Sequence, residues 1–345
     1  ESNQGNKVGA NNIVLQPLDE TQYSLSLGGP IIKNKLFFFA NIDRTAQVRP
    51  GQNRVAATPS APFGSNPNIA RPTAAELNDI RSYLMRTYNY DPGVYQGYAN
   101  ESYNNKILAR LDWNINKDHR FNIRYNQVES ATPSFISTST GGTGFNFPNN
   151  GGRSNPGHLH FSNSNYTQEA NQYSLAAELN SSFGSKLSNT LRGSFTHQND
   201  PRGSESDVFP LVDIMKDGTA YTTFGYEPFT YGNLRDVQTY SFTDNLTMSL
   251  GNHELTLGLQ MDFSTTKNGF QRFGTGAYRF NSWNDFVNGA NPNDYAITYS
   301  LSPGYAQAFP TFKFQQYSAY FQDNFRVGEK LNITAGLRFE LPTYP

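Results

Sequence analysis

Some residues in this sequence have types and spacings that could support chemistry, beginning with the glycine-rich stretch Gly141-Gly-Thr-Gly144. A glycine-rich loop cradles phosphate when Lys-Ser or Lys-Thr follows it and when it joins a strand to a helix. Neither feature is found around Gly141–Gly144. We therefore interpret this stretch as a flexible loop.

His158-Leu-His160 has the spacing of two metal ligands on one side of an extended segment. A zinc site needs at least a third ligand from the protein. The two histidines lie in a polar loop, and no partner is evident from the sequence. We predict no metal site here.

Acidic side chains recur on the polar positions of several predicted strands, where arginines alternate with them. Carboxylates that work as a catalytic pair need a shared site and different pKa values, which alternation along strands does not provide. We predict ion pairs on a wall rather than catalysis, and the sequence gives no reason to expect an enzyme or a cofactor. The residues are Asp112, Glu178, Asp262 and Glu340, with Arg110, Arg192 and Arg338.

One predicted loop is rich in aromatic side chains. These rings could stack on a ligand, or they could pack the loops onto one another, and the sequence leaves both readings open. Ligand-binding residues therefore remain unassigned. The aromatic residues are Tyr221, Phe224, Tyr226, Phe229 and Tyr231.

The elements that hold these residues are hairpins. In the first, residues 23–44, Tyr23, Leu25 and Leu27 share one face, and a turn over 28–35 leads to a return strand that begins at Leu36. This alternation is typical of β-strands with two different faces. Four more hairpins follow, which gives about ten strands of roughly 9–14 residues, against about 9–11 for a membrane crossing.

Short turns alternate with long loops at about 45–103, 130–168, 199–236 and 268–313. A capping box at Thr73 and helical spacing predict a helix over 74–88 in the first loop. Residues 282–287 in the last loop are expected to form one helical turn. Residues 1–22 are read as an irregular lead-in from a missing plug region, with Ile13–Leu15 as a possible short strand, and residues 23–345 as a partial barrel.

Composition agrees with a membrane barrel. The net charge of −1 offers no basic surface for nucleic acid. No run approaches 18 apolar residues, so no transmembrane helix is expected, but a barrel hides its apolar residues at alternate positions. We predict an all-β, antiparallel up-and-down transmembrane barrel with short periplasmic turns and long extracellular loops; a secreted β-sandwich or β-solenoid is the alternative.

Asp244 and Asp323 break the pattern, because strict alternation places both on the apolar face of their strands. A charge at the middle of a bilayer costs about 2–4 kcal/mol, and less near the interface. We expect either an interfacial position or a bulge that resets the register.

The stretch Gly28-Gly-Pro-Ile-Ile-Lys-Asn-Lys-Leu-Phe-Phe-Phe-Ala-Asn-Ile-Asp-Arg44 resembles the start of the barrel in Oar-like TonB-dependent receptors of the bacterial outer membrane. The end of the loop helix at Tyr88–Gly93, the strand Lys106–Trp113 and the Phe-x-Asp-Asn hairpins at Phe242 and Phe321 are similar to the same family. The resemblance runs from about residue 20 to the end. It implies a 22-stranded barrel with an N-terminal plug, opened by TonB to pass a bulky ligand.

The sequence departs from the complete family pattern: it has no TonB box, no carboxypeptidase-regulatory-like domain, no recognisable plug and no final strands with their terminal aromatic. We therefore expect a fragment of an outer-membrane transporter, about the first half of the barrel. Its expected partners are outer-membrane lipid, an unknown extracellular ligand, and the TonB complex through a plug that this sequence lacks. A passive porin or structural barrel, or a secreted glycan-binding β-protein, are the alternatives.

Overall fold

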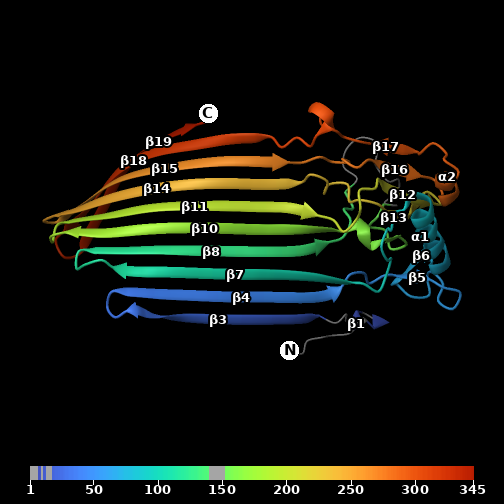
Figure 1. The fold of residues 1–345 in the computed structure, drawn as a ribbon, viewed down its shortest axis with the longest axis horizontal. Coiled ribbons are helices and arrows are strands. Elements are labelled where there is room, and N and C mark those ends of the chain that lie inside the picture. Colours follow the sequence, from blue (N-terminus) through green and yellow to red (C-terminus); the bar gives the residue numbers. More distant parts are fainter. Residues whose placement is uncertain (1–6, 9–10, 13–17, 140–151) are drawn as a thin grey trace.

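The structure is a computed structural model that describes residues 7–8, 11–12, 18–139 and 152–345. Its main element is one antiparallel sheet. Ten strands lie side by side in the order β19-β18-β15-β14-β11-β10-β8-β7-β4-β3 (Figure 1). Each strand thus pairs with the strands of this sheet that come directly before and after it in the sequence. This confirms the predicted up-and-down order of about ten strands. The strands are β3 (Asp19–Ile32), β4 (Leu36–Pro50), β7 (Ala99–Asn114), β8 (His119–Ser134), β10 (Tyr166–Phe183), β11 (Leu187–Gly203), β14 (Leu234–Leu250), β15 (His253–Gly269), β18 (Thr311–Val327) and β19 (Leu331–Thr343).

The strands are longer than the sequence predicted, at 13 to 18 residues. In the first hairpin, β3 continues through the pair Gly28-Gly29 to Ile32, and a register shift between Pro30 and Ile32 precedes a short turn. The predicted turn over 28–35 is therefore too long. Glycine suits position 28, because a Cβ there would come within 3.0 Å of the Phe39 ring and 3.2 Å of the Phe38 carbonyl oxygen.

The apolar face of the sheet is not covered by a second layer. Its leucines are well exposed: Leu257 and Leu259 are each 52% accessible, and Leu337 is 70% accessible. A β-sandwich would bury these side chains against a facing sheet. The sandwich alternative is therefore wrong, and we call this uncovered side the apolar face and the opposite side the polar face.

Asp244 and Asp323 stay on the apolar face, because the registers of β14, β15 and β18 run without a bulge. The bulge that the sequence suggested is therefore wrong. Each carboxylate instead has a polar partner on the neighbouring strand: Asn189 donates to Asp244, and His253 Nδ1 lies 2.7 Å from Asp323 Oδ2. Asp323 is four residues from the end of β18, which places it near the short turns.

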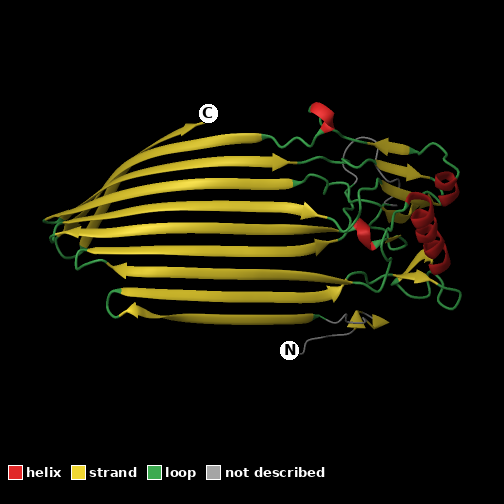
Figure 2. Ribbon diagram, in the orientation of Figure 1, coloured by secondary structure: helices red, strands yellow, loops and turns green. Residues whose placement is uncertain are grey.

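The four long connections gather at one end of the sheet, and the short turns lie at the other (Figure 2). We call the described parts of residues 51–98, 135–165, 204–233 and 270–310 the cap. A five-stranded sheet in the cap, ordered β17-β16-β12-β13-β9, draws on three of the four connections. The cap elements are β5 (Val55–Ala57), β6 (Ile69–Thr73), α1 (Ala74–Tyr88), β9 (Leu159–His160), η2 (Ser162–Ser164), β12 (Leu211–Lys216), β13 (Thr219–Phe224), β16 (Ala277–Phe280), α2 (Trp283–Val287), β17 (Asp294–Ala296) and η3 (Pro303–Tyr305).

Helix α1 has the limits that the sequence predicted. Thr73 and Glu76 form a capping box, and Asn89 ends the helix in the left-handed conformation with φ of 52°. Leu77, Ile80 and Leu84 are buried. The helical turn expected over 282–287 is α2, capped by Ser282.

Two further short strands, β1 (Lys7–Val8) and β2 (Asn11–Asn12), pair with each other. The possible strand at Ile13–Leu15 and the glycine-rich stretch 141–144 lie outside the described residues. Among the residues that are described, no helix has the length and apolar character needed to cross a membrane.

Candidate functional site

Charged side chains on the polar face of the sheet pair along and across strands. Arg110 binds Asp112 two residues away on β7, with a shortest N–O distance of 2.6 Å. Arg192 of β11 reaches Glu178 of β10, and Arg338 and Glu340 pair on β19 at 2.6 Å. Three of the four predicted wall carboxylates, Asp112, Glu178 and Glu340, thus pair with arginines as predicted. Asp262 instead accepts a hydrogen bond from Gln260.

The cap has a hydrophobic core of its own, to which all four connections contribute. Leu77, Phe161, Phe224 and Phe280 come from the first, second, third and fourth connections, and each is at most 8% accessible. Apart from Ala131 in β8, every buried hydrophobic side chain of the described chain lies in the cap. The long loops are therefore one folded unit.

A buried ion pair joins the second connection to the third. Arg153 contacts Asp213 through two hydrogen bonds of 2.9 and 2.8 Å, and their side chains are 2% and 0% accessible. Thr223 Oγ1 donates to Asp213 at 2.7 Å. A buried pair of this kind depends on good geometry and on further hydrogen bonds, both of which are present.

His158 and His160 lie beside this pair, with their rings stacked at 5.8 Å. His158 Nε2 lies 2.9 Å from Thr223 Oγ1. His160 Nε2 lies 2.9 Å from Asn165 Oδ1. Burial lowers the pKa of His160 to about 4 and that of His158 well below its usual value.

The described residues hold no group of three or more His, Cys, Asp or Glu side chains that could bind a metal ion. Both histidines instead satisfy polar groups inside the cap.

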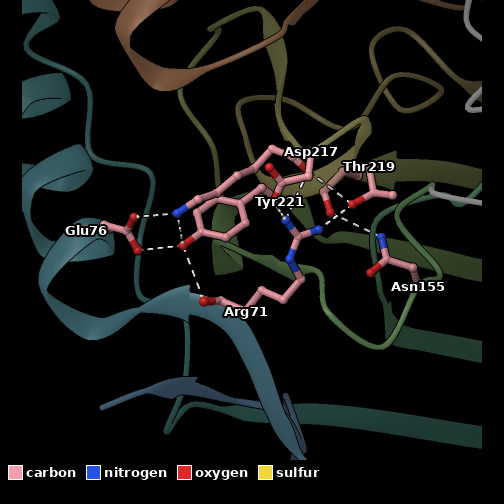
Figure 3. A network of polar contacts seen from close by, with 8 residues as sticks. Arg71, Glu76, Asn155, Asp217, Thr219 and Tyr221 are labelled. Carbon is pink, nitrogen blue, oxygen red and sulfur yellow. Dashed lines mark hydrogen bonds and ion pairs between the residues drawn. The ribbon is translucent and has the colours of Figure 1, made fainter. Parts of the chain in front are cut away.

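A second polar network ties the first connection to the third, around the turn between β12 and β13 (Figure 3). Glu76 accepts hydrogen bonds from Tyr221 and Thr73, and its Oε1 lies 3.0 Å from Lys216 Nζ. Arg71 pairs with Asp217 at 2.9 Å. Burial alone would raise the pKa of Glu76, but the hydrogen bonds from Tyr221 and Thr73 outweigh it and lower that pKa to about 2.

The aromatic residues of the third connection all contact other residues of the cap. Tyr221 and Phe224 are buried, so they pack the loops together. Tyr226 and Tyr231 contact each other edge to face at 6.1 Å, and Phe229 packs on Phe270 and Phe273. Tyr226, Phe229 and Tyr231 are half-buried, so these three rings also keep part of their surface exposed.

Sequence reasoning missed the residues that join the connections, chiefly Arg71, Arg153 and Asp213. Arg71 and its ion-pair partner Asp217 are 146 residues apart along the chain, and Arg153 and Asp213 are 60 residues apart. Two sequence signals touched the network around Glu76: the capping box located Thr73 and Glu76, and the aromatic loop included Tyr221.

Comparison with known proteins agrees with the geometry. The sequence model of a family described as "Outer membrane beta barrel domain" matches residues 2–345. No curated protein sequence matches the chain.

The sheet and cap are similar to part of several solved structures. The outer membrane transporter YddB from Escherichia coli has 11% identity and a TM-score of 0.58, over 95% of this chain and 35% of that one. FpvA from P. aeruginosa, bound to a heterologous pyoverdine with iron, has 14% identity and a TM-score of 0.50, over 94% and 36%. The chain thus spans about a third of the length of these structures, and at these identities the likeness shows the fold.

Proposed function

The chain belongs to the outer membrane beta barrel domain family, and from this premise we propose that it is part of the wall and the extracellular cap of a TonB-dependent transporter. The outer membrane is its location, the apolar face of the sheet meets lipid, and the polar face lines the barrel interior. In this proposal the cap meets a bulky ligand outside the cell. The observation that carries it is an uncovered apolar face on ten strands whose long connections all lie at one end.

The edges of the sheet support a larger barrel. Strands β3 and β19 each pair with one neighbour only among the described residues. Unpaired backbone groups exposed to lipid cost several kcal/mol each. Further strands are therefore required to close the wall, in agreement with the 22 strands that the sequence resemblance implies.

The polar face supports the presence of an inner plug. It carries several ion pairs, and Arg124 has no ion-pair partner among the described residues. A plug with complementary charge would meet this surface in the complete protein.

The full-length protein tests the proposal in two steps. A barrel in detergent should migrate faster on a gel before boiling than after it, and a water-soluble, monodisperse protein would exclude the barrel. Co-purification with the periplasmic domain of TonB should depend on the segment upstream of residue 1. A barrel that conducts ions continuously in a planar bilayer and does not bind TonB would instead be a passive porin.

A further inference from the structure

A cavity of about 490 Å³ opens in the cap between α1, the turn after β12 and the start of α2. Cavities of ~300–1,000 Å³ with a few convergent polar groups are the usual form of small-molecule sites. This cavity lies next to the network of Figure 3, whose Glu76, Asp217 and Tyr221 form part of its lining.

One wall of the cavity is aromatic and held in place. The indole of Trp283 stacks on Phe286, with centroids 5.2 Å apart and planes 17° apart, and meets Tyr83 edge to face at 5.3 Å. Ile80, Ile214 and Met215 add an apolar floor. A rigid aromatic ring offers contact area to a ligand at little entropic cost.

The charges of the lining are largely matched within the protein. Lys216 pairs with Glu76, and Asp217 pairs with Arg71. Asp79 on α1 and Asn284 on α2 are exposed residues at the mouth of the cavity, and their side chains have no hydrogen-bond or ion-pair partner among the described residues. The cavity therefore offers unused carboxylate and amide groups beside an aromatic wall, without an excess of positive charge for an anion.

We propose that this cavity binds a neutral saccharide, whose hydroxyls donate to Asp79 and Asn284 while its C–H face lies on Trp283. A carboxylate accepts hydrogen bonds from hydroxyl groups and an amide both accepts and donates, which suits a ligand rich in hydroxyls. An apolar ligand would leave Asp79 desolvated without a partner, at a free-energy cost. The inference rests on the proposed function only in that the cap must face the outside of the cell.

The test uses tryptophan fluorescence of the full-length protein in LDAO micelles, which carry no sugar headgroup. Trp113 and Trp283 are the tryptophans of this chain, and Trp113→Phe, together with Phe at any tryptophan outside residues 1–345, leaves Trp283 as the reporter. Glucose, galactose, mannose, xylose, N-acetylglucosamine and their disaccharides are titrated singly. At least one should change the Trp283 emission saturably, with a Kd of about 1 mM or tighter.

Substitutions of residues outside the cap core test which side chains of the lining contribute to binding. Asp79→Ala should weaken binding roughly tenfold, a loss expected for a hydrogen bond to a charged group, and Asp79→Asn should weaken it less. Asn284→Ala should also weaken it. Phe63→Ala, which removes an exposed cap aromatic outside the cavity, should leave the affinity unchanged.

Three results would overturn the proposal: no saturable signal with any of these sugars, equal affinity in Asp79→Ala and the parent, or binding of N-acetyl-lysine amide in preference to every sugar. If N-acetyl-lysine amide binds best, and if Asp79→Asn weakens its binding as much as Asp79→Ala does, the cavity is a site for a cation. Failure of the proposed function is seen separately, because gel migration and TonB binding are measured on the same preparations.

Discussion

Arg153 and Asp213 put a fully buried ion pair between two loops that are otherwise separate in sequence. Asp213→Ala would leave the guanidinium buried without its carboxylate, which typically costs about 3–5 kcal/mol. We expect the cap of this variant to open, with faster hydrogen exchange in β12 and β13 while the strands of the wall stay protected. Asp217→Ala is the matched control, because Asp217 is 83% accessible and its pair with Arg71 is worth less than about 1 kcal/mol. Equal effects of the two variants would mean that the buried pair does not hold the loops together.

His160 makes the cap sensitive to acid. Its folded pKa of about 4 lies below its ordinary value of 6.5, so the folded cap favours the neutral ring. The stability of the cap should be complete above about pH 6.5 and decline as the pH falls towards about 4, since the unfolded form takes up the proton first. Protection factors of the cap amides, which correct for the pH dependence of intrinsic exchange, measure this change between pH 7 and pH 4.5. His160→Gln should reduce it. His253→Gln, outside the cap, should leave the change as it is; a pH dependence identical in His160→Gln and the parent would contradict the assignment.

At the scale of single elements, helix α1 depends on its first turn. The Thr73 side chain accepts from Glu76 N at 3.2 Å, and Glu76 Oε2 accepts from Thr73 N at 3.0 Å. Thr73→Ala removes the cap hydroxyl and should destabilise the helix by about 0.5–2 kcal/mol. Exchange rates of the α1 amides report the loss, with the exposed Ser60→Ala as control. An unchanged α1 would show that tertiary packing, rather than the capping box, fixes where the helix begins.

The elements also show what the sequence could and could not predict. Alternation found the ten wall strands, and the capping box with Leu77, Ile80 and Leu84 found α1, because these signals are local and periodic. The sequence placed the strand ends too early. Near the cap, polar residues such as His197 and Asp236 occupy the apolar face, so the alternation of apolar and polar residues disappears there. The cap sheet was missed because its pairs, such as Thr222 with Leu159 and Asp213 with Arg279, join short segments from different loops.

For the whole molecule, neighbouring positions on one strand should meet different solvents. Leu257 lies on the apolar face, whereas Thr256 lies on the polar face within 3.4 Å of Thr247. In the full-length protein in vesicles, Leu257→Cys should react with a lipid-soluble maleimide and resist a charged one. We expect the reverse preference for Thr256→Cys if water reaches that part of the polar face. Labelling of Leu257→Cys by the charged reagent alone would exclude lipid contact.

The common core of the cap limits how far any one of its four connections can change by itself. Leu77, Phe161, Phe224 and Phe280 reach one another from four different connections, so replacing a single connection with that of a relative removes one wall of a shared interior. Chimaeras that exchange one loop should lose order in the other three, and only a transplant of all four together should keep it. Sequence changes would then be tolerated most freely in exposed segments such as 59–68, which lie outside that interior.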